Sequence, residues 1–72
     1  MNIKIAKPIL LGMTPKHFYT AQSLCYRLRI NRVTMVTYLN KLLLQGFIRA
    51  RRQRKKTDYG ITAKGTKFKN LL

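Results

Sequence analysis

The strongest hydrophobic pattern of the chain lies between residues 32 and 45. Its apolar positions are Met35, Leu39, Leu42 and Leu43. They have the i, i+4, i+7, i+8 spacing that lines one face of an α-helix. Asn31 can cap the first turn with its side chain, and Gly46 stands where helices commonly end. The pattern therefore predicts an amphipathic helix over residues 32–45.

A shorter helix is predicted directly before it. Thr20 offers an N-cap hydroxyl, and the apolar residues that follow again have helical spacing. They are Ala21, Leu24, Cys25 and Leu28. Two helices joined by about three residues have the spacing of a helix-turn-helix, here over about residues 21–45. That spacing alone is weakly specific, because many all-α domains contain it.

Beyond residue 46 the pattern changes to short extended segments. They are a strand at residues 47–51, a basic loop at 52–57 and a return strand at 58–62. Thr62 can cap a last helix over about residues 63–71. A β-hairpin directly after the second helix of a helix-turn-helix is the wing of a winged helix. We therefore expect a wing over about residues 47–62.

The first twenty residues have the least regular pattern. Pro8 fits the first turn of a short helix that begins there, because a proline needs no N–H at that position. Gly12 and Pro15 would end this helix. Phe18 and Tyr19 favour β structure but are too few for an independent strand, so we expect them to pair with a distant segment.

Together these elements predict an α+β fold, a winged helix-turn-helix. It would contain three helices, a two- to three-stranded β wing and a short C-terminal helix. A chain of 72 residues has room for one small core, so a single domain over residues 1–72 is expected.

The charge of the chain narrows its function. Sixteen Lys and Arg residues face a single acid, Asp58, and the formal net charge is +15. One carboxylate excludes paired-carboxylate hydrolysis and leaves little for binding hard metal ions. Because 46% of the residues are apolar, we expect a folded core rather than a disordered basic tail. A folded domain this basic favours a polyanion as its partner.

Other chemistry is poorly represented. We interpret Cys25, the only cysteine, as a small buried hydrophobe rather than a reactive thiol, and it can form no intramolecular disulfide. His17 has no partner at metal-ligand spacing. The sequence has no glycine-rich phosphate loop and no set of nucleophile, base and orienting group, so neither an enzyme nor a cofactor is expected.

No membrane association is expected either. The longest apolar stretch, residues 8–13, is far short of the ~20 residues that a membrane span needs. The N-terminal residues do not have the pattern of a signal peptide. These features predict a cytoplasmic protein, associated with the nucleoid or acting in a host cytoplasm if it is viral.

Three short motifs resemble winged-helix transcription regulators of the MarR type. Residues 24–35 (LCYRLRINRVTM) are similar to the family pattern L-A-x-x-L-x-[VI]-[ST]-x-x-T-[VI]. Residues 46–49 (GFIR), which follow Leu39 and Leu42, are similar to G-[LF]-[IV]-x-R, and residues 61–65 (ITAKG) to L-T-x-K-G. Each motif is moderately specific, but their order and spacing together are strong over about residues 20–69.

The resemblance implies the fold and binding to double-stranded DNA. Arg29 stands where the family usually has glycine in the turn between the helices. Family members usually add long helices for dimerisation and for a small-molecule pocket, and 72 residues leave no room for them, so no small-molecule effector is expected. Very short winged helices of this type occur in phages, plasmids and other mobile elements.

The resemblance places the helix at residues 32–45 in the major groove. The candidate contacts there are Asn31, Arg32, Val33, Thr34, Val36, Thr37, Asn40 and Lys41. Arg32 would contact a phosphate or guanine, and Val33, Val36 and Thr37 thymine methyl groups. Alternatively, the valines pack under the wing or at a partner interface. Thr34 would contact a phosphate or bond back to a helix carbonyl.

Six cations crowd into the eight residues 49–56. The wing candidates are Arg49, Arg51, Arg52, Arg54, Lys55 and Lys56. Wing arginines of such proteins often enter the minor groove, and the alternative is a solvated loop that raises only nonspecific affinity. Strand alternation places Arg49 and Arg51 on one face, opposite Ile48 and Ala50. Further candidates for phosphate contacts are Lys16, Thr20 and Arg27.

Four functions fit these observations. The leading hypothesis is a sequence-specific transcriptional regulator. A second is an architectural, excision or replication accessory protein that binds DNA. A third is an RNA-binding or ribosome-associated module, and a fourth is a winged helix that binds a protein such as polymerase. A homodimer is open as well. Leu43 and Leu44 extend the apolar surface, and Leu71 and Leu72 could either form a two-fold dimer or cover the core together with the N-terminal segment, whereas Phe68 is expected in the core.

Overall fold

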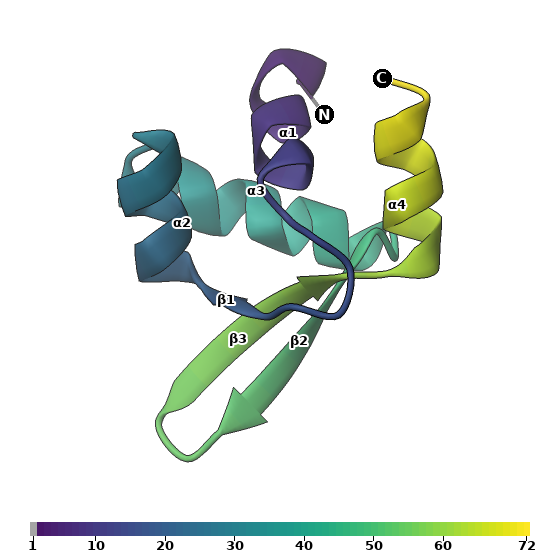
Figure 1. Cartoon of the computed structure of the whole chain (residues 1–72). Coiled ribbons are helices and arrows are strands. Elements are labelled where there is room, and N and C mark those ends of the chain that lie inside the picture. Colours follow the sequence, from purple (N-terminus) through teal and green to yellow (C-terminus); the bar gives the residue numbers. More distant parts are fainter. Residues whose placement is uncertain (1) are drawn as a thin grey trace.

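The computed structural model describes residues 2–72 as four helices and a three-stranded antiparallel sheet (Figure 1). The helices are α1 (Ile3–Leu11), α2 (Ala21–Leu28), α3 (Arg32–Leu44) and α4 (Ala63–Asn70). The strands are β1 (Tyr19–Thr20), β2 (Ile48–Gln53) and β3 (Lys56–Ile61), in the spatial order β1-β3-β2. The predicted α+β architecture, with a hairpin directly after α3, is confirmed.

Each helix begins at a residue whose side chain caps it. Thr20 accepts a hydrogen bond from the backbone N–H of Ser23, at 3.1 Å. Asn31 and Thr62 do the same for α3 and α4, as predicted. These bonds satisfy N–H groups that have no partner inside the helix, so they fix where the helices start.

The first helix differs from the prediction. It begins at Ile3, and Pro8 lies inside it rather than in its first turn. A proline inside a helix costs about 3 kcal/mol. Ala6, Ile9 and Leu10 are fully buried on the core side of α1, and each large apolar side chain gains about 1.5–3 kcal/mol from burial. Burial of this face therefore outweighs the proline.

The core lies between the helices and the base of the hairpin. Its buried residues are Ala6, Ile9, Leu10, Met13, Leu24, Met35, Tyr38, Leu39, Leu42, Ile48 and Ile61. Only the base of the hairpin is part of this core, and the rest projects from the molecule (Figure 1). Phe68 packs against the core and stacks on Phe47, with ring centroids 4.3 Å apart, whereas Leu44 and Leu71 are exposed.

Two positions explain parts of the quoted motifs. Arg29 ends α2 in the left-handed conformation, with φ 55°, as expected for the position that is usually glycine. At Gly65, an added Cβ would overlap the carbonyl oxygen of Phe47. The ITAKG segment therefore needs a glycine because α4 starts directly against the segment that enters β2.

Phe18 and Tyr19 were expected to pair with a distant segment, and Tyr19 does so as part of β1, whereas Phe18 directly precedes the strand. Tyr19 faces Tyr59 and Thr20 faces Asp58 in β3. This pairing ties the segment before α2 to the hairpin. The helix-turn-helix and the wing are therefore parts of one sheet-linked unit.

Candidate nucleic-acid interface

One face of α3 is exposed and carries small side chains. Val33 is 78% exposed and Val36 38% exposed, and Arg32, Thr37 and Asn40 are also on the surface. The Thr37 hydroxyl donates to the backbone oxygen of Val33 at 2.8 Å. This bond uses the hydroxyl proton within the helix. The exposed face therefore offers apolar groups between one cation and one amide.

The flanking candidates on α3 have roles within the protein. The Asn31 side-chain oxygen accepts from the backbone N–H of Thr34 at 2.8 Å, and Thr34 itself is half-buried beside α1. Lys41 lies over the ring of Tyr38, with its Nζ 5.1 Å from the centroid. The other exposed candidates on α3 lie between Arg32 and Asn40.

A groove of about 440 Å³ lies between the helix-turn-helix and the wing. It is lined by Thr20, Ala21, Gln22, Arg32, Val36, Lys55, Lys56, Thr57 and Tyr59. Arg32 lies on the helix side, and Lys55 and Lys56 lie on the wing side. The groove thus brings predicted residues from two separate sequence regions together and places cations on both of its walls.

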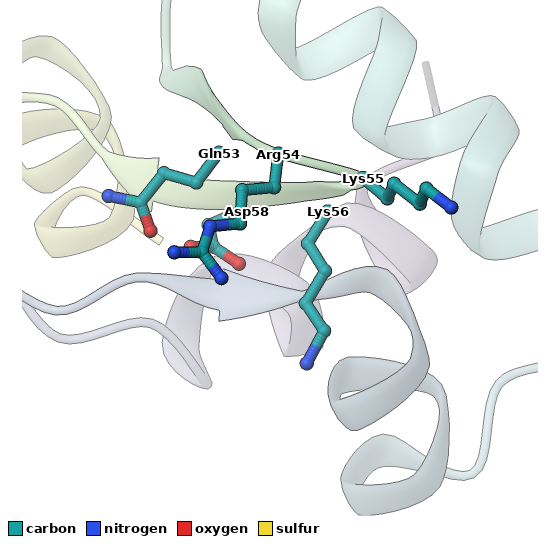
Figure 2. A pocket seen from close by; sticks show the side chains of 5 residues that line it. All are labelled: Gln53, Arg54, Lys55, Lys56 and Asp58. Carbon is teal, nitrogen blue, oxygen red and sulfur yellow. The ribbon is translucent and has the colours of Figure 1, made fainter.

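The wing ends in a two-residue turn made by Arg54 and Lys55. Arg54 has a positive φ of 53°, a region that favours glycine. Gln53, Arg54, Lys55, Lys56 and Asp58 line a hollow at this end of the hairpin. Figure 2 shows the side chains of Arg54, Lys55 and Lys56 leaving the turn in different directions. The tip therefore presents its charges over a wide angle.

The two faces of β2 differ. Ile48 is buried on the core side. Arg49 and Arg51 both lie over the ring of Phe18, with their Cζ atoms 5.2 and 4.0 Å from its centroid. The predicted sharing of one face is therefore confirmed. Arg51 also pairs with Asp58 at 3.3 Å, so these two arginines have partners within the chain.

The three candidates upstream of α3 lie apart from one another. Thr20 caps α2 and lines the groove. Arg27 donates to the backbone oxygen of Gly12 at 2.9 Å and lies over the ring of Tyr19, which occupies its guanidinium. Lys16 lies in a loop with φ 70° and borders a hollow next to Arg49, outside the groove.

The hydroxyl of Tyr19 is also held within the fold. Burial raises the pKa of Tyr19, but the hydrogen bond from Thr14 and the positive charge of Arg27 together outweigh it, so the pKa is lower than usual. The tyrosine and Arg27 therefore stabilise each other. Their contacts join α2 to the loop that follows α1.

Phe18 and Gly60 also belong to the surface around the wing, although neither was predicted as a site residue. An added Cβ at Gly60 would lie 3.0 Å from the Phe18 ring. A glycine inside a strand often marks a close approach of another segment, which was the available signal. The partner could not be named, because Phe18 is far away in the sequence.

Two further observations concern metal ligands and membrane-crossing helices. Within residues 2–72, no group of three or more His, Cys, Asp or Glu side chains is arranged to hold a metal ion. None of the helices described for these residues has the length and apolar character that crossing a bilayer requires.

No known family model and no curated protein sequence matches the chain. Solved structures do match its fold. An ArsR-like transcriptional regulator from Rhodococcus sp. RHA1 superposes with a TM-score of 0.76 at 19% identity, over 94% of this chain and 63% of that one. FabT of Streptococcus pneumoniae, solved in complex with DNA, gives a TM-score of 0.77 at 25% identity, over 99% of this chain and 51% of that one.

These similarities define the class of the protein. The chain folds as a winged helix-turn-helix, like the two solved structures, which confirms the predicted fold. It spans between half and two thirds of the length of those two solved chains.

Proposed function

We propose that this domain binds double-stranded DNA in a sequence-specific manner and regulates transcription. The observation that carries the proposal is the groove between α3 and the wing, with Arg32 on one wall and Lys55 and Lys56 on the other. A phosphate backbone is the ligand that suits cations on both walls. The DNA-bound state in which FabT was solved supports the same function for this fold.

In the proposed complex, α3 enters the major groove. Its exposed face carries small side chains, which allow a helix to approach base edges closely. Val33 and Val36 would meet thymine methyl groups, and Arg32 a guanine edge or a phosphate. Asn40, one turn further along, would meet a base or a phosphate. The proposed place of action is the cytoplasm, on the DNA of the nucleoid.

The wing would then follow the neighbouring minor groove. Arg52, Arg54, Lys55 and Lys56 are exposed near its tip. Narrow A·T-rich minor grooves concentrate negative potential and attract such side chains. Affinity would come mainly from the wing, and sequence choice mainly from α3.

Selection of bound sequences from a random duplex pool tests this proposal. We expect enrichment of one short motif by the intact protein at two salt concentrations. Arg32→Ala should lose most of this enrichment. Lys67→Ala is the matched control. Lys67 is exposed on α4, so this change also removes one positive charge but should keep the motif.

Failure to enrich any motif, with binding retained, would contradict the regulator and favour an architectural DNA-binding protein. Equal loss of the motif in both variants would mean that net charge, rather than α3, decides binding.

A further inference from the structure

Phe18 lies on the face of the hairpin that carries Arg49 and Arg51. The guanidinium carbon of Arg51 lies 4.0 Å from the centroid of the Phe18 ring, and that of Arg49 lies 5.2 Å from it. Cations at such distances are attracted to the electron-rich face of an aromatic ring. Phe18 directly precedes β1, which runs beside β3 (Figure 1). The ring therefore connects the segment that enters α2 with β2.

Gly60 makes this contact possible. A Cβ at this position would lie 3.0 and 3.1 Å from two ring atoms of Phe18 and 3.2 Å from the His17 backbone oxygen. Those distances are too short for ordinary packing. The absence of a side chain at position 60 lets the loop lie directly on the sheet.

Asp58 completes the cluster. It is the only acid of the chain, and it pairs with Arg51 at 3.3 Å. Its side chain is only 17% exposed, whereas that of Arg51 is 47% exposed. Asp58 also faces Thr20 of β1 in the sheet. The single negative charge thus lies where β1, β3 and β2 meet.

We propose that Phe18, Arg49, Arg51, Asp58 and Gly60 form a clamp that fixes the angle of the wing against the helix-turn-helix. Arg49 and Arg51 are then positioning residues, and the wing cations that neutralise phosphates are Arg52, Arg54, Lys55 and Lys56. This division of the wing rests on the proposed DNA binding. The clamp itself does not, because it can be measured in the free protein.

The direct test is backbone order at the wing tip, residues 53–56, measured by amide NMR relaxation without DNA. We expect order parameters near 0.85 for a rigid backbone in the intact protein and below about 0.6 in Phe18→Leu. Phe18→Leu keeps an apolar side chain and the net charge but removes the aromatic face. Phe18→Tyr, which keeps that face, should restore the order.

Arg51→Ala and Arg52→Ala form a matched pair for the same measurement. Each variant removes one positive charge, and the two residues are neighbours on opposite faces of β2. We expect a mobile wing tip in Arg51→Ala and an unchanged one in Arg52→Ala. Should Phe18→Leu fail to fold, this pair decides the question. Unchanged order in the folded clamp variants, or equal mobility in the matched pair, overturns the proposal.

The salt dependence of DNA binding tests the positioning role. Each phosphate contact contributes about 0.9 to the slope of log affinity against log salt. Arg52→Ala should lower the slope by about 0.9, whereas Arg51→Ala should weaken binding roughly five-fold with a slope change below about 0.3. A full 0.9 loss for Arg51→Ala would show a phosphate contact and overturn that role. Absence of any DNA binding by the intact protein would contradict the proposed function but leave the clamp measurement valid.

Discussion

At the residue scale, the exposed face of α3 would determine which bases the proposed complex can distinguish. Val33 and Val36 offer methyl groups, and the Thr37 hydroxyl is bonded back to Val33. Such a face cannot make many polar contacts with base edges. It suits the C5 methyl group, which distinguishes thymine from the other bases in the major groove.

Replacing thymine by deoxyuridine in the selected DNA site tests the proposed contacts with thymine methyl groups. The exchange removes only the methyl group and keeps every hydrogen-bonding atom. A buried methyl contributes about 0.8 kcal/mol, so each contacted thymine should cost roughly four-fold in affinity in a binding titration. Val36→Ala should reduce this sensitivity. Equal affinity of the intact protein for both duplexes would contradict the thymine contacts.

Gly65 allows a second prediction at this scale. Gly65→Ala should lower the free energy of unfolding by more than about 2 kcal/mol, because the new Cβ overlaps the backbone of Phe47. The control is Gly46→Ala. Its φ is 77°, but the nearest atoms to an added Cβ are 3.8 Å away, at ordinary contact distance, so only about 1 kcal/mol should be lost. Urea denaturation measures both. An equal or smaller loss in Gly65→Ala would contradict the close approach of α4.

At the scale of elements, local signals were sufficient to predict where α2, α3 and α4 begin. The caps at Thr20, Asn31 and Thr62 and the apolar stripe of α3 act over a few residues, so the sequence predicts them. The start of α1 could not be predicted, because Pro8 is tolerated only through long-range burial of its helix. Proline disfavours the interior of a helix, but tertiary packing of α1 outweighs this local preference.

In the wing, too, local sequence signals do not reveal contacts with distant residues. Alternation along β2 correctly placed Arg49 and Arg51 on one face, but it could not show that Phe18 and Asp58 occupy that face. Those partners come from the loop before β1 and from β3. A run of six cations therefore predicts a basic wing. The structure adds that Arg52 lies on the opposite face of β2 from Arg49 and Arg51, and that Arg54 and Lys55 form the turn.

The turn of the wing gives a prediction for this element. Arg54 adopts a positive φ, so Arg54→Gly should raise the free energy of unfolding by up to about 1 kcal/mol. The same change should weaken DNA binding, because it removes a cation from the tip. Arg54→Lys separates the two effects, because lysine keeps the charge and, unlike glycine, has no preference for this conformation. Lower stability of Arg54→Gly together with unchanged affinity would contradict the proposed role of the turn.

At the scale of the whole molecule, the net charge of +15 predicts that the affinity for DNA falls steeply as the salt concentration rises. If about six phosphates are neutralised, the slope of log affinity against log salt should be near −5. Titrations of a duplex at several salt concentrations measure it. A slope shallower than −2 would mean that most cations lie away from the DNA.

In the proposed function, α3 selects a DNA sequence while the cations supply general affinity. Competition measures this most directly: a labelled copy of the selected duplex is displaced by unlabelled selected duplex, unrelated duplex or structured RNA. We predict that the selected duplex competes on the order of a thousand-fold more effectively than either of the others. Equal inhibition by unrelated duplex and structured RNA, at the concentration at which the selected duplex competes, would contradict the claim.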